Sequence, residues 1–300
     1  MNTCVLCSKN DEGMALDLLR LLRKLGVPSS AFSIGADWRT GPKCLDEALA
    51  PFTHFIVAFT GRSSSSSWLP FAAGYALGNG KPLLLFRPSR EPQQDAWLAS
   101  FPLFSSPEDL SAFLETENRE WAALSIRRQA RQELMELGVS FRGQAFADSV
   151  SEGNVHAVEL FIRAGMPVDS RDLKGVPMLC LAARTGHRAL LDLLLENGAS
   201  PDIPAEDRGN TALMDAVAGG FLDIMEDLLA AGASLEHRSK DGQTALVIAV
   251  GKNDSGSAAL LLAAGADPEA ADKLGFSARK YAKLFHDPKM TALMETHPPK

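Results

Sequence analysis

The chain has 300 residues, 46% hydrophobic and 22% charged, which is enough to bury one large or two ordinary cores. Its formal net charge is −7, and residues 139–300, with 16 basic and 22 acidic side chains, carry −6 of it, which argues against nucleic acid or an anionic membrane as a partner. There is no membrane-length apolar run, no secretory pattern at the start and too few cysteines, four, for a disulfide framework, so we expect a cytoplasmic protein.

The first part of the chain alternates apolar runs with segments of helical periodicity. The expected strands cover 3–8, 29–35, 53–60, 81–87 and 101–106, and the expected helices cover 11–26, 42–52, 68–80 and 107–138. The strand at 53–60, "THFIVAFT", is apolar throughout, as strands inside parallel sheets are. This pattern predicts a doubly wound, parallel-sheet α/β domain over residues 1–117.

Residues 118–139 are expected to form a bridging helix. Between Arg119 and Leu137 there is no Gly, no Pro and no serine cluster, so nothing there resembles a flexible linker. The first repeat of the following region lacks an opening turn, which leaves an apolar face to be covered. Three residues at the end of the helix are predicted to cover it: Leu134, Met135 and Leu137.

Residues 140–300 contain a repeat of 33–34 residues. One series of glycines, Gly175, Gly209, Gly242 and Gly275, shows the spacing directly. Each unit reads as a turn, a short helix beginning near Thr211 or Thr244, a Leu-rich second helix, and a Gly that ends it. Such units bury their apolar faces only by stacking.

The skeleton "G-x-T-A-L…A…G…LL…GA" resembles the ankyrin repeat. The resemblance covers about residues 140–297, in four to five units including caps, and implies an all-α ankyrin-repeat solenoid. Two departures are visible: Pro177 stands where Thr is usual, and "GKNDSGSAAL" lacks the usual Gly-His between helices. An ankyrin stack implies a protein partner on its concave face. We expect contacts from repeating turn-tip residues and neighbouring inner-helix residues, namely Asp172, Lys174, Asp207, Asn210, Met214, Asp241, Gln243 and Val247.

A second resemblance lies in "THFIVAFTGRSSSSSWLPFAAGYALGNGKPLLLF". It is similar to the superfamily of Toll/interleukin-receptor (TIR) domains and nucleoside 2-deoxyribosyltransferases. The matching residues are Phe71, Gly74, Tyr75, Ala76, Gly80, Lys81 and Pro82. This resemblance implies the same α/β fold for about the first 115 residues.

The residue at position 72 distinguishes enzymes of this superfamily from non-catalytic relatives. Enzymes of that superfamily use a glutamate at this place, because cleavage of a glycosidic bond needs a nearby carboxylate, and this chain has Ala72. No acid occurs between Thr60 and Arg90, although Asp11 and Glu12 follow the first strand. We therefore expect no catalytic residue and no cofactor. An N-glycosidase remains a minor alternative.

Binding without catalysis is a further alternative, as in a nucleotide- or NAD-binding sensor. Ligands of open α/β sheets bind at the carboxyl ends of the strands. The residues there, Ser8, Lys9, Asn10, Gly61, Arg62, Ser63 and Ser64, are the candidates for a nucleotide or sugar-phosphate ligand.

The remaining polar residues suggest no metal site. Cys4 and Cys7 are three residues apart within a strand, so they are predicted to face opposite sides as buried small hydrophobes. No histidine pair shows metal-ligand spacing. His156 and His187 are expected to make structural hydrogen bonds between repeats.

Overall fold

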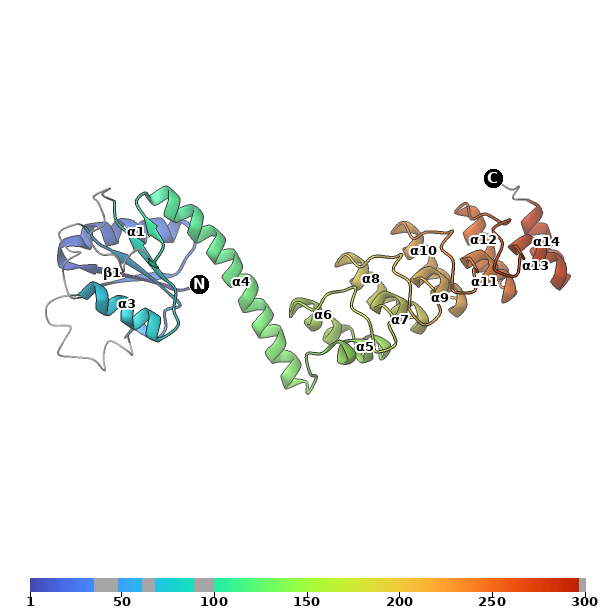
Figure 1. Cartoon of the computed structure of the whole chain (residues 1–300), viewed down its shortest axis with the longest axis horizontal. Coiled ribbons are helices and arrows are strands. Elements are labelled where there is room, and N and C mark those ends of the chain that lie inside the picture. The colour runs from blue at the N-terminus through green and yellow to red at the C-terminus, as the bar shows by residue number, and fades with distance from the viewer. Residues whose placement is uncertain (35–47, 61–67, 89–99, 297–300) are drawn as a thin grey trace. The chain divides into compact units, whose positions relative to one another are not determined.

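The computed structural model describes residues 1–34, 48–60, 68–88 and 100–296, in two compact units, Met1–Ser125 and Ile126–Lys300 (Figure 1). The helix expected over 42–52 falls largely outside the described residues, and the candidate ligand residues Gly61, Arg62, Ser63 and Ser64 fall wholly outside them.

The N-terminal unit contains a five-stranded parallel sheet in the order β2-β1-β3-β4-β5, with every pairing parallel. Its elements are β1 (Thr3–Ser8), the 3-10 turn η1 (Lys9–Asp11), α1 (Glu12–Lys24), β2 (Ser29–Ile34), β3 (His54–Ala58), α3 (Trp68–Gly78), β4 (Leu83–Phe86), β5 (Leu103–Phe104) and the first part of α4 (Pro107–Glu136). The predicted parallel sheet is confirmed, and the order places β1 beside both β2 and β3.

Apolar cores lie on both faces of this sheet, because successive side chains of a strand point in opposite directions. Cys4 and Leu6 of β1 pack with α3, whereas Val5 and Cys7 pack with α1 and the first turns of α4. Figure 1 shows α1 and α3 on opposite sides of the sheet. The prediction that Cys4 and Cys7 face opposite sides is confirmed.

Helix α4 is continuous over its 30 residues. Its early residues Leu110 and Leu114 are buried in the N-terminal unit, and its later residues Ala130 and Leu134 are buried in the core of the repeats. Only Leu134 of the three predicted covering residues is buried, at 0% exposure, whereas Met135 is 77% exposed and Leu137 is also exposed. Helical periodicity explains the correction, since Ala130 and Leu134 are four residues apart on one face and Met135 is turned by about 100°.

Ten short helices form the described repeats. They are α5 (Gly143–Ser151), α6 (Val155–Arg163), α7 (Met178–Thr185), α8 (Arg188–Glu196), α9 (Ala212–Gly219), α10 (Leu222–Ala230), α11 (Ala245–Gly251), α12 (Ser255–Ala263), α13 (Ala278–Phe285) and α14 (Pro288–Glu295). Odd-numbered helices contact the next odd-numbered helix, and even-numbered helices contact the next even-numbered one. The five helix pairs therefore stack in two rows, an inner row beginning with α5 and an outer row beginning with α6 (Figure 1).

The turns that join successive pairs form a row of their own. Backbone hydrogen bonds connect each turn to the next: Glu206 N donates to Gly175 O at 3.0 Å, Lys240 N to Arg208 O at 2.8 Å, and Lys273 N to Asp241 O at 3.1 Å. Gly209 permits this close approach, because its φ is +71° and a Cβ there would lie 2.8 Å from the backbone nitrogen of Lys240.

Only one of the two N-caps expected at the starts of the repeat helices forms a side-chain hydrogen bond. The hydroxyl of Thr244 accepts a hydrogen bond from Val247 N at 3.4 Å, as expected of an N-cap, but that of Thr211 makes no cap bond. In the atypical "GKNDSGSAAL" turn, Asn253 adopts φ +57°, a conformation that Gly186 and Gly220 supply in earlier repeats. Asn tolerates this left-handed conformation better than most side chains, which explains how the turn forms without glycine.

Candidate functional site

The repeats present one surface on which turns and inner helices meet, and we call it the hairpin face. It consists of the turns 171–177, 205–211, 238–244 and 271–277 together with the adjoining sides of α7, α9, α11 and α13. Direct contacts show that these elements adjoin: Arg184 of α7 bonds Asp207 in a turn, and the Tyr281 hydroxyl of α13 donates to Asp272 at 2.7 Å. The outer-row helices bond to one another instead, as Arg188 of α8 does to Asp227 of α10.

A basic side chain stands at the tip of every turn on the hairpin face. The four are Lys174, Arg208, Lys240 and Lys273, and all are exposed. They recur at nearly the repeat spacing in a unit whose overall charge is negative. Of this row only Lys174 was among the predicted contact residues, although the other three recur close to the same 33-residue spacing.

Each of the other predicted partner-contact residues holds a turn in place, is accessible on the hairpin face, or is buried. Asp172 holds its own turn, since its Oδ1 accepts hydrogen bonds from Lys174 N and Val176 N, both at 2.8 Å. Asp241 is exposed and Gln243 is half-buried, so both lie on the accessible part of the face.

Three residues of the predicted contact set are buried instead. Met214 and Val247 belong to the core between helices, and Asn210 is buried with its amide donating to Asp215 Oδ1 at 2.9 Å. Some side chains of the inner-row helices are exposed on the hairpin face and others are buried in the core. The sequence pattern alone did not distinguish the two groups. These three side chains support the stack and are not offered to a partner.

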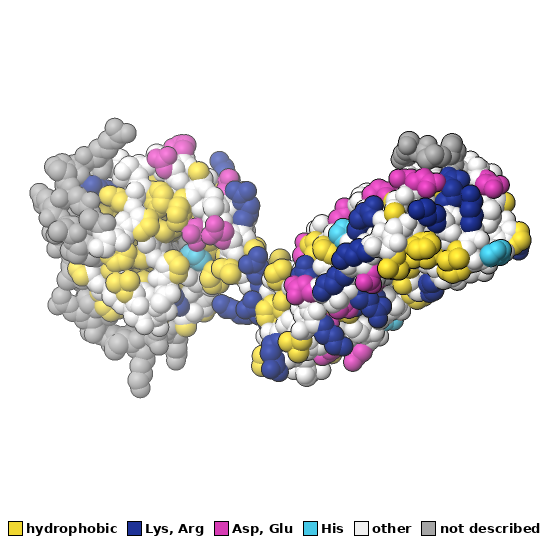
Figure 2. All heavy atoms as spheres, turned by 45° about the vertical axis from the view of Figure 1, so that its right-hand side comes forward, with side chains coloured by type: hydrophobic (Ala, Val, Ile, Leu, Met, Phe, Trp, Pro, Cys, Tyr) yellow, Lys and Arg dark blue, Asp and Glu magenta, His cyan; other side chains and the backbone are white. Residues whose placement is uncertain are grey.

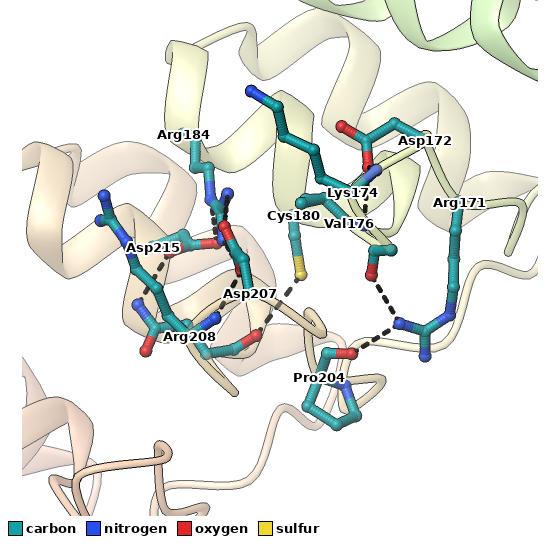
Figure 3. A network of polar contacts seen from close by, with 12 residues as sticks. Arg171, Asp172, Lys174, Val176, Cys180, Arg184, Pro204, Asp207, Arg208 and Asp215 are labelled. Atoms are coloured by element: carbon teal, nitrogen blue, oxygen red, sulfur yellow. Dashed lines mark hydrogen bonds and ion pairs between the residues drawn. The ribbon is translucent and has the colours of Figure 1, made fainter.

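Asp207 belongs to a polar network that crosses two repeats (Figure 3). Arg184 donates from both terminal guanidinium nitrogens to Asp207, at 2.7 and 3.0 Å, and from Nε to Asp215 at 2.7 Å. The hydrogen bond from Arg184 lowers the pKa of Asp207 to about 2, whereas burial raises the pKa of Asp215 above its ordinary value despite the same partner. The network fixes the turn 205–211 against α7.

Arg171 makes a similar connection on the other side of the same turn. Its guanidinium donates to the carbonyls of Gly175 at 2.7 Å and Pro204 at 3.0 Å, so that it spans two successive repeats (Figure 3). Arg238, two repeats later, donates in the same way to Gly242 and Ala271. Neither Arg184, Arg171 nor Arg238 was singled out from the sequence, because nothing in a single chain separates a structural arginine from a surface one.

His187 makes the structural contact expected of it. Its Nε2 lies 3.1 Å from the carbonyl oxygen of Ser151 in the preceding repeat, and its ring packs beneath Gly153. For His156 no such contact is described.

At the carboxyl edge of the parallel sheet, the candidate residue Ser8 ends β1, and the candidates Lys9 and Asn10 follow it in η1. Ser8 accepts a hydrogen bond from Asn10 N at 3.2 Å and donates to Asp11 Oδ2 at 2.6 Å. Asp11 is buried, and its second oxygen accepts a hydrogen bond from the Thr60 hydroxyl at 3.0 Å. The carboxylate of Asp11 thus joins the ends of β1 and β3, and the described contacts of Ser8 and Asn10 are internal to this edge.

Ala72 lies in the middle of α3 and is buried against the sheet. Its methyl group packs in the same core as Phe55 and Leu69, so position 72 is an apolar core position. Burial also raises the pKa of Cys4 to about 12 and that of Cys7 to about 11, which keeps both thiols protonated at neutral pH and unsuited to thiolate chemistry.

Comparison with known proteins identifies the repeats. The family model for ankyrin repeats in three copies matches residues 146–239 and 204–272. A protein of Treponema pallidum (strain Nichols) described as ankyrin repeat-containing is 34% identical over 242 residues, which cover 81% of this chain and 81% of that protein. Since residues 140–300 number fewer than 242, this similarity also reaches into the first part of the chain.

A second relative matches a shorter part of the chain. Protein HOS4 of Saccharomyces cerevisiae is 36% identical over 110 residues, 36% of this chain and 10% of that protein. Within the described residues, no helix is long and apolar enough to cross a membrane. The resemblance seen in the 33-residue repeat is confirmed by family model, relatives and structure alike, and the chain belongs to the ankyrin repeat-containing proteins.

Proposed function

We propose that the repeat unit is an interaction module whose protein partner binds across the hairpin face. The observation that carries the proposal is the row of exposed tips, each with a basic side chain, on turns that are fixed to one another by backbone hydrogen bonds. A rigid row of this kind presents side chains at set spacings without paying conformational entropy on binding. The stack is, on this proposal, an ankyrin solenoid whose concave side is the hairpin face.

The exposed contact residues follow from the geometry. Lys174, Arg208 and Asp241 are exposed at tips, and Gln243 is half-buried beside them. Asp172 and Asp207 contribute indirectly, because they hold the turns on which those side chains stand. A partner can therefore contact fewer residues than the number that recur in the turns.

Charge reversal on the hairpin face tests the proposal. The full chain carrying Lys174→Glu, Arg208→Glu and Asp241→Lys is used as bait beside the parent, and each partner recovered is then purified and its affinity measured directly. A matched control carries the exposed outer-row changes Glu159→Lys and Glu226→Lys. Loss of affinity with the first variant and retention with the second supports the proposal. Equal affinities of all three chains overturn it.

For the N-terminal unit, we propose a doubly wound domain of the TIR/deoxyribosyltransferase-like type that has no catalytic activity. The strand order and the apolar cores on both faces support the fold, and the buried Ala72 supports the absence of a catalytic carboxylate on α3. A cytoplasmic location belongs to the same proposal. Incubation of the chain with NAD and with purine and pyrimidine nucleosides, followed by chromatography for released base, is expected to show none, and base release above a no-protein blank would contradict it.

The alternative of ligand sensing in the N-terminal unit is tested separately. All four tryptophans, Trp38, Trp68, Trp97 and Trp121, precede residue 126, so tryptophan fluorescence of the full chain reports on this unit alone. A saturable change on titration with NAD or a nucleotide, lost on Asn10→Ala, would favour sensing over a purely structural role.

A further inference from the structure

The last described repeat carries a cluster of exposed apolar side chains on the hairpin face. The rings of Phe276, Tyr281 and Phe285 form a ladder, with centroids 5.2 Å apart between Phe276 and Tyr281 and 5.8 Å apart between Tyr281 and Phe285. Leu274 precedes the ladder in the turn and Leu284 is next to Phe285 on α13; both are exposed, whereas Tyr281 is half-buried. We call these five residues the aromatic ladder surface. Phe285 is 50% exposed and Leu284 is 55% exposed, although both are large and apolar.

The preceding repeat has a different composition at the same positions. One repeat earlier, Asp241 stands in the place of Leu274, Gln243 in that of Phe276, and Lys252 in that of Phe285. The aromatic ladder surface is therefore peculiar to the last described repeat and is not a requirement of the repeat fold. Contiguous exposed apolar side chains of this kind mark interaction surfaces in proteins.

Positive charge surrounds the ladder. Lys273 stands at the turn tip, and Lys280 and Lys283 are exposed on α13, which also supplies two of the three rings. None of these lysines forms an ion pair with a carboxylate in the part of the chain that the structure describes. In the space-filling view, Lys and Arg side chains adjoin hydrophobic side chains on the repeat unit (Figure 2).

The acidic residues nearby are already engaged within the repeat. Glu269 Oε1 lies 2.6 Å from Arg279 Nε, and Asp272 accepts hydrogen bonds from the Tyr281 hydroxyl and from the backbone nitrogens of Leu274 and Phe276. These contacts lower the pKa of Asp272, although its burial opposes them, and so keep its carboxylate ionised inside the turn. The lysines therefore form no ion pair with these two carboxylates. Lys280 Nζ donates instead to the carbonyl of Gly275 at 2.9 Å, and Lys273 lies in the turn next to that of Asp241.

We infer that the aromatic ladder surface binds an acidic segment of a partner protein, seated with an aliphatic or aromatic side chain against Phe276, Tyr281 and Phe285. Carboxylates on either side of that anchor would then meet Lys273, Lys280 and Lys283. Aromatic anchors supply contact area at low entropic cost, and the lysines supply complementarity of charge. This inference rests on the proposed interaction function and adds the chemistry of the partner and the repeat that selects it.

Fluorescence anisotropy with the full chain tests the inference. The probe is a fluorescein-labelled 16-residue peptide in which Glu and Asp flank Leu and Phe. Two control probes change one feature each, with Lys in place of the acids or with Ser in place of the apolar residues. Only the acidic apolar probe is expected to bind, with an affinity that falls as salt rises from about 0.05 to 0.3 M, since screening weakens exposed charge pairs.

Variants locate the site. Lys280→Glu with Lys283→Glu is expected to weaken binding of the probe by about tenfold or more. Phe285→Ala is expected to weaken it several-fold, at both low and high salt, because it removes apolar contact and no charge. The matched control is Lys289→Glu, an exposed lysine on α14 of the outer row, which is expected to leave binding unchanged. Circular dichroism melts check that each variant keeps its helices.

Three outcomes would overturn the inference. Failure of the acidic probe to bind, while charge reversal at the other tips still abolishes capture of a natural partner, would overturn this inference and leave the proposed function intact. Equal binding of a single-stranded RNA oligonucleotide would indicate a general anion surface. Concentration-dependent dimerisation of the chain in light scattering, abolished by Phe285→Ala, would show that the ladder is an interface between two copies.

Discussion

Nε of Arg184 lies 2.7 Å from Oδ2 of Asp215 and so ties α7 to α9 at a position where the neighbouring repeats have apolar residues. Leu181 and Ile248 occupy the place of Asp215 one repeat before and one repeat after it. Asp215 is buried, while Arg184 reaches the surface to meet Asp207. One repeat of the stack is thus joined to its neighbour by a buried charge pair rather than by apolar packing alone.

Removal of one partner of this pair should be costly. Asp215→Ala leaves Arg184 partly buried beside an empty site and strips Asn210 of its acceptor, and we expect the free energy of unfolding to fall by about 3 kcal/mol. Asp227→Ala on the outer row removes the partner of Arg188, which is half-exposed, and should cost much less, because solvent screens an exposed pair. Urea unfolding followed by circular dichroism measures both, and equal losses would contradict the distinction between the buried and the exposed pair.

Glycine in the turns provides a second test. Gly209→Ala places a side chain at φ +71° and within 2.8 Å of a backbone nitrogen, and should destabilise the repeats by about 2 kcal/mol or more. Gly251 lies in α11 with nothing within 4 Å of an added Cβ, so Gly251→Ala should be neutral or should stabilise by up to about 1 kcal/mol. A melting temperature that falls equally in both variants would show that the turn row does not depend on close approach.

Helix α4 packs on the repeat core with only one of its sides, the side that carries Ala130 and Leu134. Leu134→Ala removes a fully buried side chain from the repeat core and should cost about 3 kcal/mol. Met135→Ala, at the next residue, changes a side chain that is mostly exposed and should cost less than about 0.5 kcal/mol. A chain beginning at residue 140 should likewise be less stable than one beginning at residue 118, and equal stability of those two chains would mean that the repeats need no cover.

Acid sensitivity of the N-terminal unit should come from His54. Burial of its ring lowers its pKa to about 4, and the nearest carboxylate oxygen, on the half-exposed Glu117, lies 3.6 Å away, too far for a hydrogen bond that would oppose this. The unfolded chain takes up the proton near the ordinary pKa of about 6.5, so stability is complete above that pH and is lost progressively as pH falls from about 6.5 to 4, by about 3 kcal/mol in total.

Tryptophan fluorescence during urea unfolding at a series of pH values measures this dependence. Trp121 packs edge-on against His54 with ring centroids 5.1 Å apart, so the signal reports on the site directly. In His54→Gln the free energy of unfolding should fall much less between pH 6.5 and 4. If it falls as steeply in the variant as in the parent, another group is responsible for the pH dependence.

The periodicities of the sequence predicted the architecture but not the roles of individual side chains. The 33-residue spacing of glycines and the alternation of Cys4 and Cys7 were sufficient for the repeats and for the two faces of the sheet, because both depend on local geometry. Burial at Met214 and exposure at Met135 depend instead on which side of a helix meets its neighbour. A rotation of one residue, about 100°, reverses that outcome, and short helices leave few residues from which to judge it.

The roles of the basic residues near the turns were harder to predict for a different reason. Arg184 and Lys174 are both basic residues near a turn, yet one is fixed by two carboxylates and the other is exposed. That difference arises from partners 23 to 31 residues away in the next repeat. The aromatic ladder surface was not predicted, because the repeat pattern indicates which units stack but not which apolar side chains of the last unit remain exposed.

Site-specific photocrosslinking in cells can show whether a protein partner binds across the hairpin face. A photoreactive phenylalanine analogue is placed at one exposed position at a time: at the tip residues Lys174, Arg208 and Asp241, or at the outer-row residues Glu159 and Glu226. If the partner binds there, the tip positions will crosslink to one common protein and the outer-row positions will not. Crosslinks to that protein from the outer row alone would show that the partner binds elsewhere.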